Sequence, residues 1–315
     1  MTMLVVDAVT DLPGRVRLIR LTDPDGGPLS SFTPGSHIVV SCGIDPQGRT
    51  RRNAYSLTGS GVEPDSYSIS VRRNDSGRGG SLWMHGLSRG ESVDVGGPRS
   101  AFAPVLTARH HVLVAGGIGV TPIFSHARAA ARWGRSFEVH YVFRDRDGPH
   151  VDDLATVCGS RLSTYRSADE LWSVLGRALF DRPLGSHLYA CGPTSLMEET
   201  ARRARGAGWP DARIHLEHFG IGDLDPGRPF VVRLLRAGID VEVPAGVSAL
   251  EALEQRGVSV PNLCRQGVCG ECRTSVTGGT VEHRDLYLSD DEKAAGDCMM
   301  PCVSRAAGAR LELEL

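Results

Sequence analysis

Four cysteines in the C-terminal part of the chain have a spacing that could hold an iron–sulfur cluster. Cys264, Cys269 and Cys272 follow the pattern Cys-x4-Cys-x2-Cys, and 29 residues separate Cys272 from Cys302. Plant-type ferredoxins bind a 2Fe–2S cluster with this spacing, because three thiolates of one loop and a fourth from elsewhere must converge on two irons. The sequence therefore predicts that these four cysteines are metal ligands.

The alternatives to an iron–sulfur cluster are a zinc site and reduced structural cysteines. A zinc site usually combines two closely spaced cysteine pairs, and the chain has one pair with Cys-x2-Cys spacing, Cys269 and Cys272. Cys298, four residues before Cys302, is a rival fourth ligand, but the spacing favours Cys302. Cys42 and Cys158 belong to no motif, and we expect them to be packing residues.

A glycine-rich turn near the middle of the chain is suited to binding a dinucleotide. In "VLVAGGIGVTPIFS" (112–125), Gly116, Gly117 and Gly119 follow a buried strand and precede a helical pattern. Such glycines let the backbone approach a pyrophosphate at the start of a helix. Thr121 is predicted to be the N-cap of that helix, and Pro122 its first residue.

A second strand, in "YACGP" (189–193), ends at Cys191, Gly192 and Pro193. Open α/β sheets bind ligands at the carboxyl ends of their strands, although a buried cysteine at a strand end is also common. The segment "FRDRDG" (143–148) is expected near the adenosine ribose. Its arginines would favour a 2′-phosphate and its aspartates a 2′-hydroxyl, and the sequence leaves this choice open.

The elements that must position these residues form three blocks and a linker. Residues 1–106 alternate short strand patterns with turns, which favours an antiparallel barrel or sandwich. Residues 107–220 alternate strands with helices, the pattern of a parallel sheet. Residues 221–229 are rich in Gly, Asp and Pro and predict a linker. Residues 230–315 begin with a hairpin and a short helix, followed by the cysteine loop and a final strand.

Composition narrows the class of protein. The chain has 315 residues and a net charge of −2, which argues against a dedicated nucleic-acid binder. It has no apolar run of about 18 residues, so no membrane span is expected. Its N-terminus lacks the pattern of a signal peptide. We therefore expect a cytoplasmic protein whose cysteines are mostly reduced or metal-bound.

The segments "PNLCRQGVCGECRTSVTGGTVEHRDLYLSDDE" and "MMPCVSRA" resemble the ferredoxin domain of the phthalate dioxygenase reductase family. The three blocks also stand in the order of that family. The resemblance implies a multidomain fold with an antiparallel β-barrel flavin domain, an α/β parallel-sheet nicotinamide domain and a β-grasp-like α+β ferredoxin domain.

The resemblance also implies a set of flavin-binding residues. "RRNAYSLTG" (51–59) resembles the motif Arg-x-Tyr-Ser, in which the tyrosine and serine lie along the isoalloxazine and the arginine meets the phosphate. Asn53 stands at the position of the family's arginine, and Arg52 is the neighbouring candidate. "SVRRNDSGRGGSLWMHG" (70–86) resembles the segment that closes over the flavin. The expected flavin-binding residues are Arg52, Asn53, Tyr55, Ser56, Leu57, Val71, Arg72, Gly79, Gly80, Ser81 and Phe219.

For the nicotinamide module, the resemblance implies Gly116, Gly117, Gly119, Thr121, Pro122, Cys191, Gly192 and Pro193, with Cys191 beside the reacting ring. The implied cofactors are FMN, favoured over FAD, NADH, favoured over NADPH, and a 2Fe–2S cluster. The implied function is a reductase that passes electrons from NADH to a terminal oxygenase, either a Rieske non-haem iron enzyme or a haem-thiolate monooxygenase.

We expect this reductase to be a monomer with no nucleic-acid or membrane partner. Two other classes are kept as alternatives. One is an NAD(P)H-dependent reductase of free flavin or of a small acceptor, and the other is an iron–sulfur redox sensor. The intact set of cysteines argues against the first, and the absence of a DNA-binding motif argues against the second.

Overall fold

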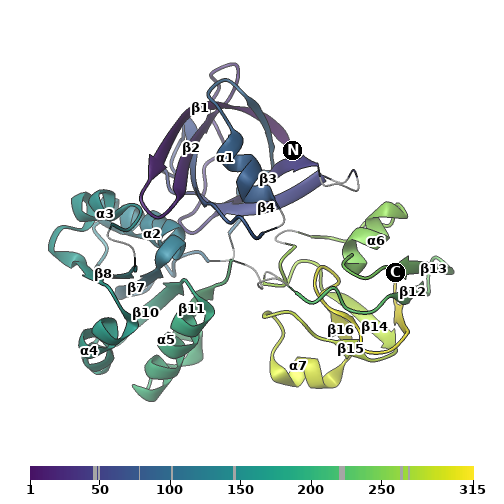
Figure 1. Ribbon diagram of the computed structural model, residues 1–315. Coiled ribbons are helices and arrows are strands. Elements are labelled where there is room, and N and C mark those ends of the chain that lie inside the picture. Colours follow the sequence, from purple (N-terminus) through teal and green to yellow (C-terminus); the bar gives the residue numbers. More distant parts are fainter. Residues whose placement is uncertain are drawn as a thin grey trace. The chain divides into compact units, whose positions relative to one another are not determined.

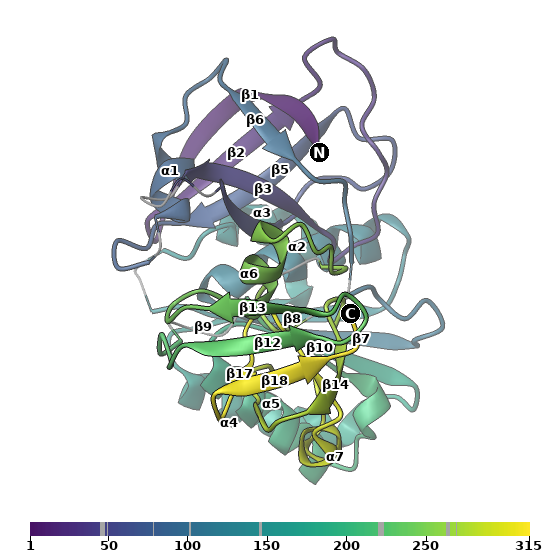
Figure 2. The same cartoon turned by 90° about the vertical axis from the view of Figure 1, so that its right-hand side faces the viewer.

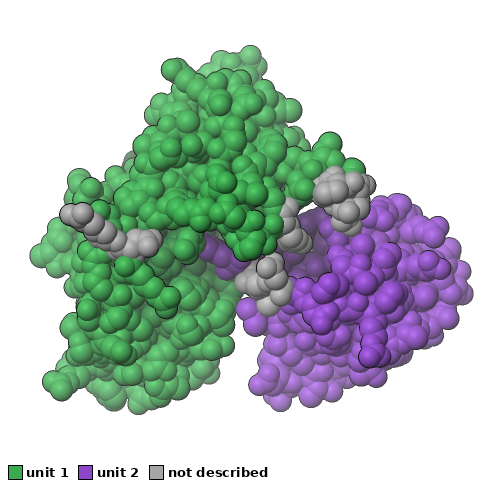
Figure 3. All heavy atoms as spheres, in the orientation of Figure 1, with its two compact units in different colours: residues 1–218 green, residues 219–315 purple. Residues whose placement is uncertain are grey.

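A computed structural model describes residues 1–315 except 45–47, 49, 78, 101, 145–146, 220–223, 263–264 and 269. The chain divides into two compact units, residues 1–218 and residues 219–315, which are coloured separately in Figure 3. Each unit has its own buried core, so each is described by itself. Part of the predicted linker, residues 221–223, lies outside the described residues.

The first unit begins with an antiparallel barrel (Figure 1). Its strand order is β4-β3-β6-β1-β2-β5. A bridge between Leu57 and Ile69 closes the barrel, and the Thr58 amide donates to the Ser68 carbonyl at 2.9 Å. Apolar side chains alternate along the strands and fill the interior. The strands are β1 (Thr2–Leu12), β2 (Val16–Thr22), β3 (His37–Ile44), β4 (Thr50–Ser56), β5 (Ser66–Arg72) and β6 (Ser92–Val95), and helix α1 (Gly80–Gly86) lies between β5 and β6.

A parallel five-stranded sheet completes the first unit. Its order is β11-β10-β7-β8-β9, so β7 and β10 are neighbours at the point where the strand order reverses. Helices α2 and α3 pack on one face, and α4 and α5 on the other. The elements are β7 (His110–Gly116), the short helix η1 (Gly117–Gly119), α2 (Val120–Arg132), β8 (Phe137–Val142), α3 (Val151–Cys158), β9 (Leu162–Tyr165), α4 (Ala168–Ala178), β10 (Ser186–Cys191), α5 (Thr194–Gly206) and β11 (Ile214–Glu217).

The second unit is a small mixed sheet with helices (Figure 2). The main sheet has the order β13-β12-β18-β14-β16, with β12 and β18 parallel, and β15 pairs with β17. Both helices begin with a capping box, Ser248 with Glu251 and Ser289 with Glu292. The elements are β12 (Phe230–Leu234), β13 (Ile239–Val243), α6 (Ala249–Gln255), β14 (Thr274–Gly278), β15 (Val281–Glu282), α7 (Asp290–Ala295), β16 (Cys298–Met299), β17 (Arg305–Ala306) and β18 (Arg310–Leu313).

Within the described ranges, no helix is long and apolar enough to cross a membrane.

Candidate functional site

In the second unit, two of the four predicted metal ligands come together. The sulfurs of Cys272 and Cys302 lie 3.3 Å apart, and both side chains are buried. Cys264 and Cys269 lie outside the described residues. Cys298 sits beside Asp297 and Arg273, and burial raises the pKa of its thiol. The geometry therefore favours Cys302 over Cys298 as the partner of Cys272, and two converging thiols fit an iron–sulfur cluster.

On the barrel, β4 presents Arg51, Asn53 and Tyr55 on one face, because side chains of a strand alternate. Asn53 Nδ2 donates to the Tyr55 hydroxyl at 3.2 Å. Burial raises the pKa of Tyr55 far above its usual range, so its phenol stays neutral. Arg52 belongs to the opposite face, is exposed, and pairs in register with Ser41.

The turn before helix α1 is pressed against this face of β4. Gly79 has a φ of 90°, a left-handed conformation that suits glycine, and a Cβ on it would lie 3.5 Å from the Arg51 guanidinium carbon. A Cβ on Gly80 would come within 2.3 Å of Asn53 Nδ2. The positive charge beside this turn thus belongs to Arg51, and the geometry favours Arg51 over the predicted Arg52 as a phosphate ligand.

The other predicted flavin residues have different surroundings. Ser56, Leu57 and Val71 are buried in the barrel. The Ser81 hydroxyl lies 3.0 Å from the Asn74 amide and 3.2 Å from the Asn74 carbonyl. Phe219 is 44% exposed and is the first residue of the second unit. Their flavin contacts remain predictions.

The glycine turn after β7 shows which glycines a ligand could approach. A Cβ on Gly119 would lie 2.3 Å from the Cys191 carbonyl oxygen, and one on Gly192 would lie 2.9 Å from the Gly116 Cα. These three glycines let the two loops pack closely. Gly117 has a φ of 53°, and a Cβ on it would meet no atom of the described residues within 4 Å, so its backbone faces open space.

The prediction that Thr121 caps helix α2 is wrong. The helix begins two residues earlier than predicted, at Val120, and a 3₁₀ turn leads into it from Gly117. Thr121 is buried, and its hydroxyl donates to the Ile118 carbonyl at 3.1 Å. Pro122 is therefore the third residue of the helix. The helix is preceded by a 3₁₀ turn and has no side-chain cap.

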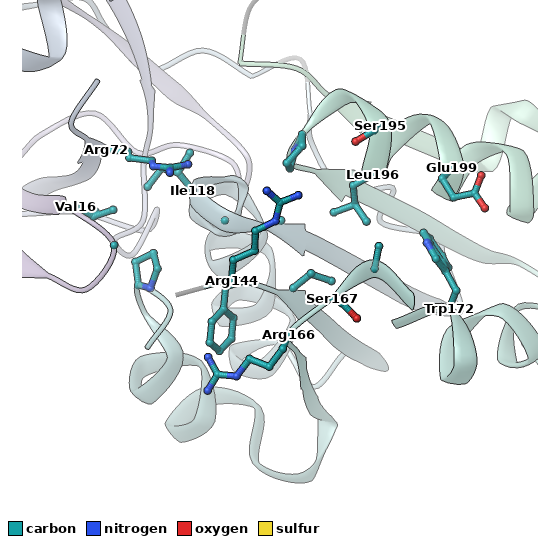
Figure 4. Close-up of a pocket in the computed structure, with 18 residues that line it drawn as sticks. Val16, Arg72, Ile118, Arg144, Arg166, Ser167, Trp172, Ser195, Leu196 and Glu199 are labelled. Carbon is teal, nitrogen blue, oxygen red and sulfur yellow. The ribbon is translucent and has the colours of Figure 1, made fainter. Parts of the chain in front are cut away.

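A cavity of about 480 Å³ opens in the first unit over the ends of β7, β8 and β10 (Figure 4). This volume and position fit a dinucleotide, because open sheets bind one where the strand order reverses. Four of the predicted site residues line the cavity: Gly116, Gly117 and Pro193 from the α/β part, and Arg72 from the barrel. Phe143, from the predicted segment 143–148, also lines the cavity. Further lining residues that no sequence motif indicated are Gly14, Val16, Ile118, Pro149, Arg166, Ser167, Trp172, Ser195, Leu196 and Glu199.

One end of the cavity carries positive charge. Arg144 follows β8, and Arg166 follows β9 and lies with its guanidinium carbon 4.6 Å from the centre of the Phe143 ring. Trp172 of α4, which is mostly buried, also lines the cavity. These residue types fit an adenosine. Asp145 and Arg146, which the ribose prediction included, lie outside the described residues.

Beside the cavity, Cys191 at the end of β10 pairs with Glu217 of β11. The Cys191 side chain is 1% exposed and packs in the core with Tyr189. Burial raises the pKa of the Cys191 thiol well above its usual value and that of Glu217 to about 8. Glu217 Oε2 is enclosed without a hydrogen-bond partner among the described residues. Glu217, whose carboxyl is kept neutral by burial at the end of a strand, is therefore a candidate site residue. No sequence motif indicated it.

The barrel beside a dinucleotide cavity, with a separate unit that carries paired thiols, defines a flavin- and nicotinamide-dependent reductase with an iron–sulfur domain. Residues 232–307 match the family model for the 2Fe-2S iron-sulfur cluster binding domain. Residues 97–214 match that for the N-terminal domain of dimethylamine monooxygenase subunit DmmA-like proteins.

Known proteins resemble the chain over nearly its whole length. It is 42% identical over 289 residues to the heme-dependent oxidative N-demethylase beta subunit of Ectopseudomonas mendocina (strain ymp), covering 91% of this chain and 90% of that protein. It is 39% identical over 307 residues to phthalate dioxygenase reductase of Burkholderia cepacia, covering 94% and 91%. A solved structure of phthalate dioxygenase reductase superposes with a TM-score of 0.83 at 35% identity, covering 99% of this chain and 97% of that one.

The chain belongs to the phthalate dioxygenase reductase family. The predicted multidomain fold is confirmed, and so is the predicted enzyme class, an NADH-dependent oxidoreductase with FMN and a 2Fe–2S cluster that serves an oxygenase system. The individual site residues remain predictions, which the geometry above supports to different degrees.

Proposed function

We propose that this reductase delivers electrons one at a time from its iron–sulfur unit to a separate terminal oxygenase protein. The observation that carries the proposal is that one chain combines the dinucleotide cavity with the buried pair Cys272 and Cys302. NADH gives up two electrons as a hydride, whereas a 2Fe–2S cluster accepts one. A bound flavin supplies the conversion between the two.

The residues of the chain have distinct parts in this function. Gly117 would offer its backbone to the pyrophosphate, and Trp172 lines the cavity that would take the adenosine. Arg51 holds the flavin phosphate beside Gly79. Neutral Cys191 and Glu217 place no charge beside the nicotinamide ring. Cys272 and Cys302, with Cys264 and Cys269, bind the cluster.

Two classes of oxygenase are candidates for the partner, since one relative is named for a dioxygenase and the other for a haem-dependent N-demethylase. We propose a Rieske or a haem-dependent oxygenase, in the cytoplasm, with the reductase as a monomer. A reducing compartment suits the free thiols of Cys42, Cys158 and Cys298 and the thiolate ligands of the cluster. The domain boundaries after residues 106, 220 and 229 are part of the same proposal.

The test compares Cys302→Ser with its matched control Cys298→Ser. Each purified protein is mixed anaerobically with NADH, and visible absorbance follows flavin and cluster, before oxygenase turnover is assayed with both classes of partner. Cys302→Ser should keep NADH-dependent flavin reduction but lose the cluster absorbance. Its oxygenase turnover should fall at least about 10-fold, because the cluster that passes single electrons to the oxygenase is missing. Cys298→Ser should behave like the wild type. Full turnover by Cys302→Ser without a cluster would instead favour a reductase of free flavin.

A further inference from the structure

Three side chains of the first unit form a line that the proposed electron path does not use. The Ser70 hydroxyl lies 2.7 Å from His150 Nε2, and His150 Nδ1 lies 2.8 Å from an Asp153 carboxylate oxygen. Ser70 belongs to β5 of the barrel, whereas His150 and Asp153 belong to the start of α3 in the α/β part. We call this line the Ser70–His150–Asp153 relay.

The directions of the two hydrogen bonds follow from the chemistry of the groups. A carboxylate oxygen only accepts, so His150 Nδ1 carries a proton and donates it to Asp153. His150 Nε2 is then free to accept the hydrogen bond of the Ser70 hydroxyl. Burial lowers the pKa of His150 despite the opposing effect of Asp153, so the ring is neutral at pH 7. The relay therefore has one defined arrangement.

The same three residue types occur in hydrolases, but here the serine is closed to substrates. Ser70 is 6% exposed and His150 is 5% exposed. Ser70 pairs in register with Leu18 in the middle of the barrel wall. Neither Ser70 nor His150 lines the dinucleotide cavity. The relay must therefore act through the position of other groups.

Those other groups form the two walls of the cavity. Arg72, two residues after Ser70 on β5, lines it from the barrel side, and Pro149, just before His150, lines it from the α/β side. The Tyr141 hydroxyl lies 3.2 Å from the Pro149 carbonyl and 3.1 Å from the Gly117 carbonyl. Because the Tyr141 hydroxyl has one proton, it donates to one of these two carbonyls at a time. Through Tyr141 and the peptide bond between Pro149 and His150, the relay is connected to the glycine turn that faces the dinucleotide.

His150 is held in a conformation that it would not choose alone. Its φ is 61°, in the left-handed region that is strained for residues other than glycine. Its ring packs on Phe124 of α2, with centroids 5.1 Å apart. Strain of this kind persists only where the surroundings fix the residue, and here they are the relay and the Phe124 ring.

We propose that the Ser70–His150–Asp153 relay is a positioning device that fixes the barrel against the α/β part, so that the nicotinamide lies at the right distance from the flavin. The inference rests on hydride transfer between those two groups. A small displacement of the reacting atoms slows such a transfer much more than it weakens binding, because the bound geometry must be close to that of the reaction.

The experiment compares Ser70→Ala with Ser68→Ala in the full-length holoprotein. Ser68 lies two residues earlier on the same face of β5 and is half-buried. Anaerobic stopped-flow mixing with NADH gives the limiting rate of flavin reduction, the NADH affinity and the long-wavelength absorbance of stacked nicotinamide and flavin. Ser70→Ala should lower the limiting rate on the order of 10-fold and weaken that absorbance, while NADH affinity and flavin content change little. Ser68→Ala should match the wild type.

Equal limiting rates in Ser70→Ala and wild type would overturn the proposal, and so would equal slowing in both serine variants. Should Ser70→Ala fail to retain flavin, Asp153→Ala provides the second test, because the Asp153 side chain is 55% exposed and its loss leaves the barrel intact. Without Asp153 the His150 ring loses its Nδ1 partner, so hydride transfer should be several-fold slower than in the wild type. A wild-type rate would overturn the proposed positioning role of the relay. A wild-type protein that NADH does not reduce at all would count against the proposed function instead.

Discussion

At the scale of single residues, the phosphate end of the flavin site depends on which arginine faces the Gly79–Gly80 turn. The motif points to the position of Asn53, and Arg52 is its nearest arginine in sequence. On a strand, however, a shift of one residue turns a side chain to the other face. Arg51 shares its face with Asn53 and Tyr55, and its Nη1 donates to the Ile44 carbonyl at 2.8 Å, which holds the guanidinium close to the turn.

This geometry predicts different effects for the two arginines. Arg51→Ala should weaken flavin binding by about 10- to 100-fold, since a charge-assisted contact to a phosphate contributes roughly 1.5–3 kcal/mol. Arg52→Ala should leave flavin affinity close to that of the wild type, because the exposed Arg52 side chain lies on the opposite face of β4. Equilibrium dialysis with detection of flavin fluorescence measures both. Loss of flavin in Arg52→Ala alone would mean that Arg52, the arginine next to the motif position, binds the phosphate. The alternation of side chains along β4 would then not decide which arginine does so.

At the scale of elements, strands and helices with strong periodic patterns could be predicted from the sequence, whereas those that depend on partners could not. The buried run of β7 and the apolar spacing of α2 are local signals. Helix α1 has only seven residues, begins at Gly80 directly after Gly79, and is stabilised by burial of Met84 in the barrel core. Residues 289–292 do contain a local signal, the capping box of α7, which the prediction did not use.

The candidate site divides in the same way. The cysteine spacing and the glycine turn lie within short segments, so the sequence shows them directly. Glu217 is brought beside Cys191 by strand pairing, and Ser70 meets His150 from 80 residues away. No periodicity or spacing indicates such pairs, because they arise from packing between elements.

The close packing of the glycine turn leads to a prediction for these elements. Gly119→Ala would place its Cβ 2.3 Å from the Cys191 carbonyl oxygen, a backbone atom that cannot rotate away. We expect unit 1 to lose about 2–4 kcal/mol of unfolding free energy and the KM for NADH to rise, since the loops must move apart. Gly206→Ala, in α5, is the control, because its Cβ would meet no described atom within 4 Å. This substitution should raise the unfolding free energy by roughly 0.5–1 kcal/mol. Urea unfolding measures both, and a Gly119→Ala variant as stable as the wild type would refute the close contact.

At the scale of the whole molecule, titratable groups are distributed unevenly between the two units. Of the eleven histidines, only His283 belongs to residues 219–315. Within the first unit, burial lowers the pKa of four histidines, His37, His111, His126 and His215, to about 4. Three of them gather around Tyr189, with ring centroids 4.5–5.7 Å from its ring. All four tryptophans also belong to this unit, so their fluorescence reports its unfolding alone.

We therefore predict that acid destabilises the first unit in a defined window. The folded pKa values near 4 lie below the value of about 6.5 for an unfolded histidine, so the unfolded chain binds more protons between these limits. The unfolding free energy is thus highest above pH 6.5 and falls as the pH drops toward 4. For the fully buried His126 alone, the loss at pH 5 is on the order of 2 kcal/mol.

Urea unfolding between pH 8 and 4.5, followed by tryptophan fluorescence for the first unit and by cluster absorbance for the second, measures this difference. The fluorescence midpoint should fall steeply below pH 6.5, and the midpoint from cluster absorbance should fall less. His111→Phe is the matched variant, because His111 Nδ1 is buried without a partner among the described residues. It should keep or raise stability at pH 8 and reduce the slope below pH 6.5 by up to about 1.4 kcal/mol per pH unit. An unchanged slope in His111→Phe would show that other groups cause the acid sensitivity.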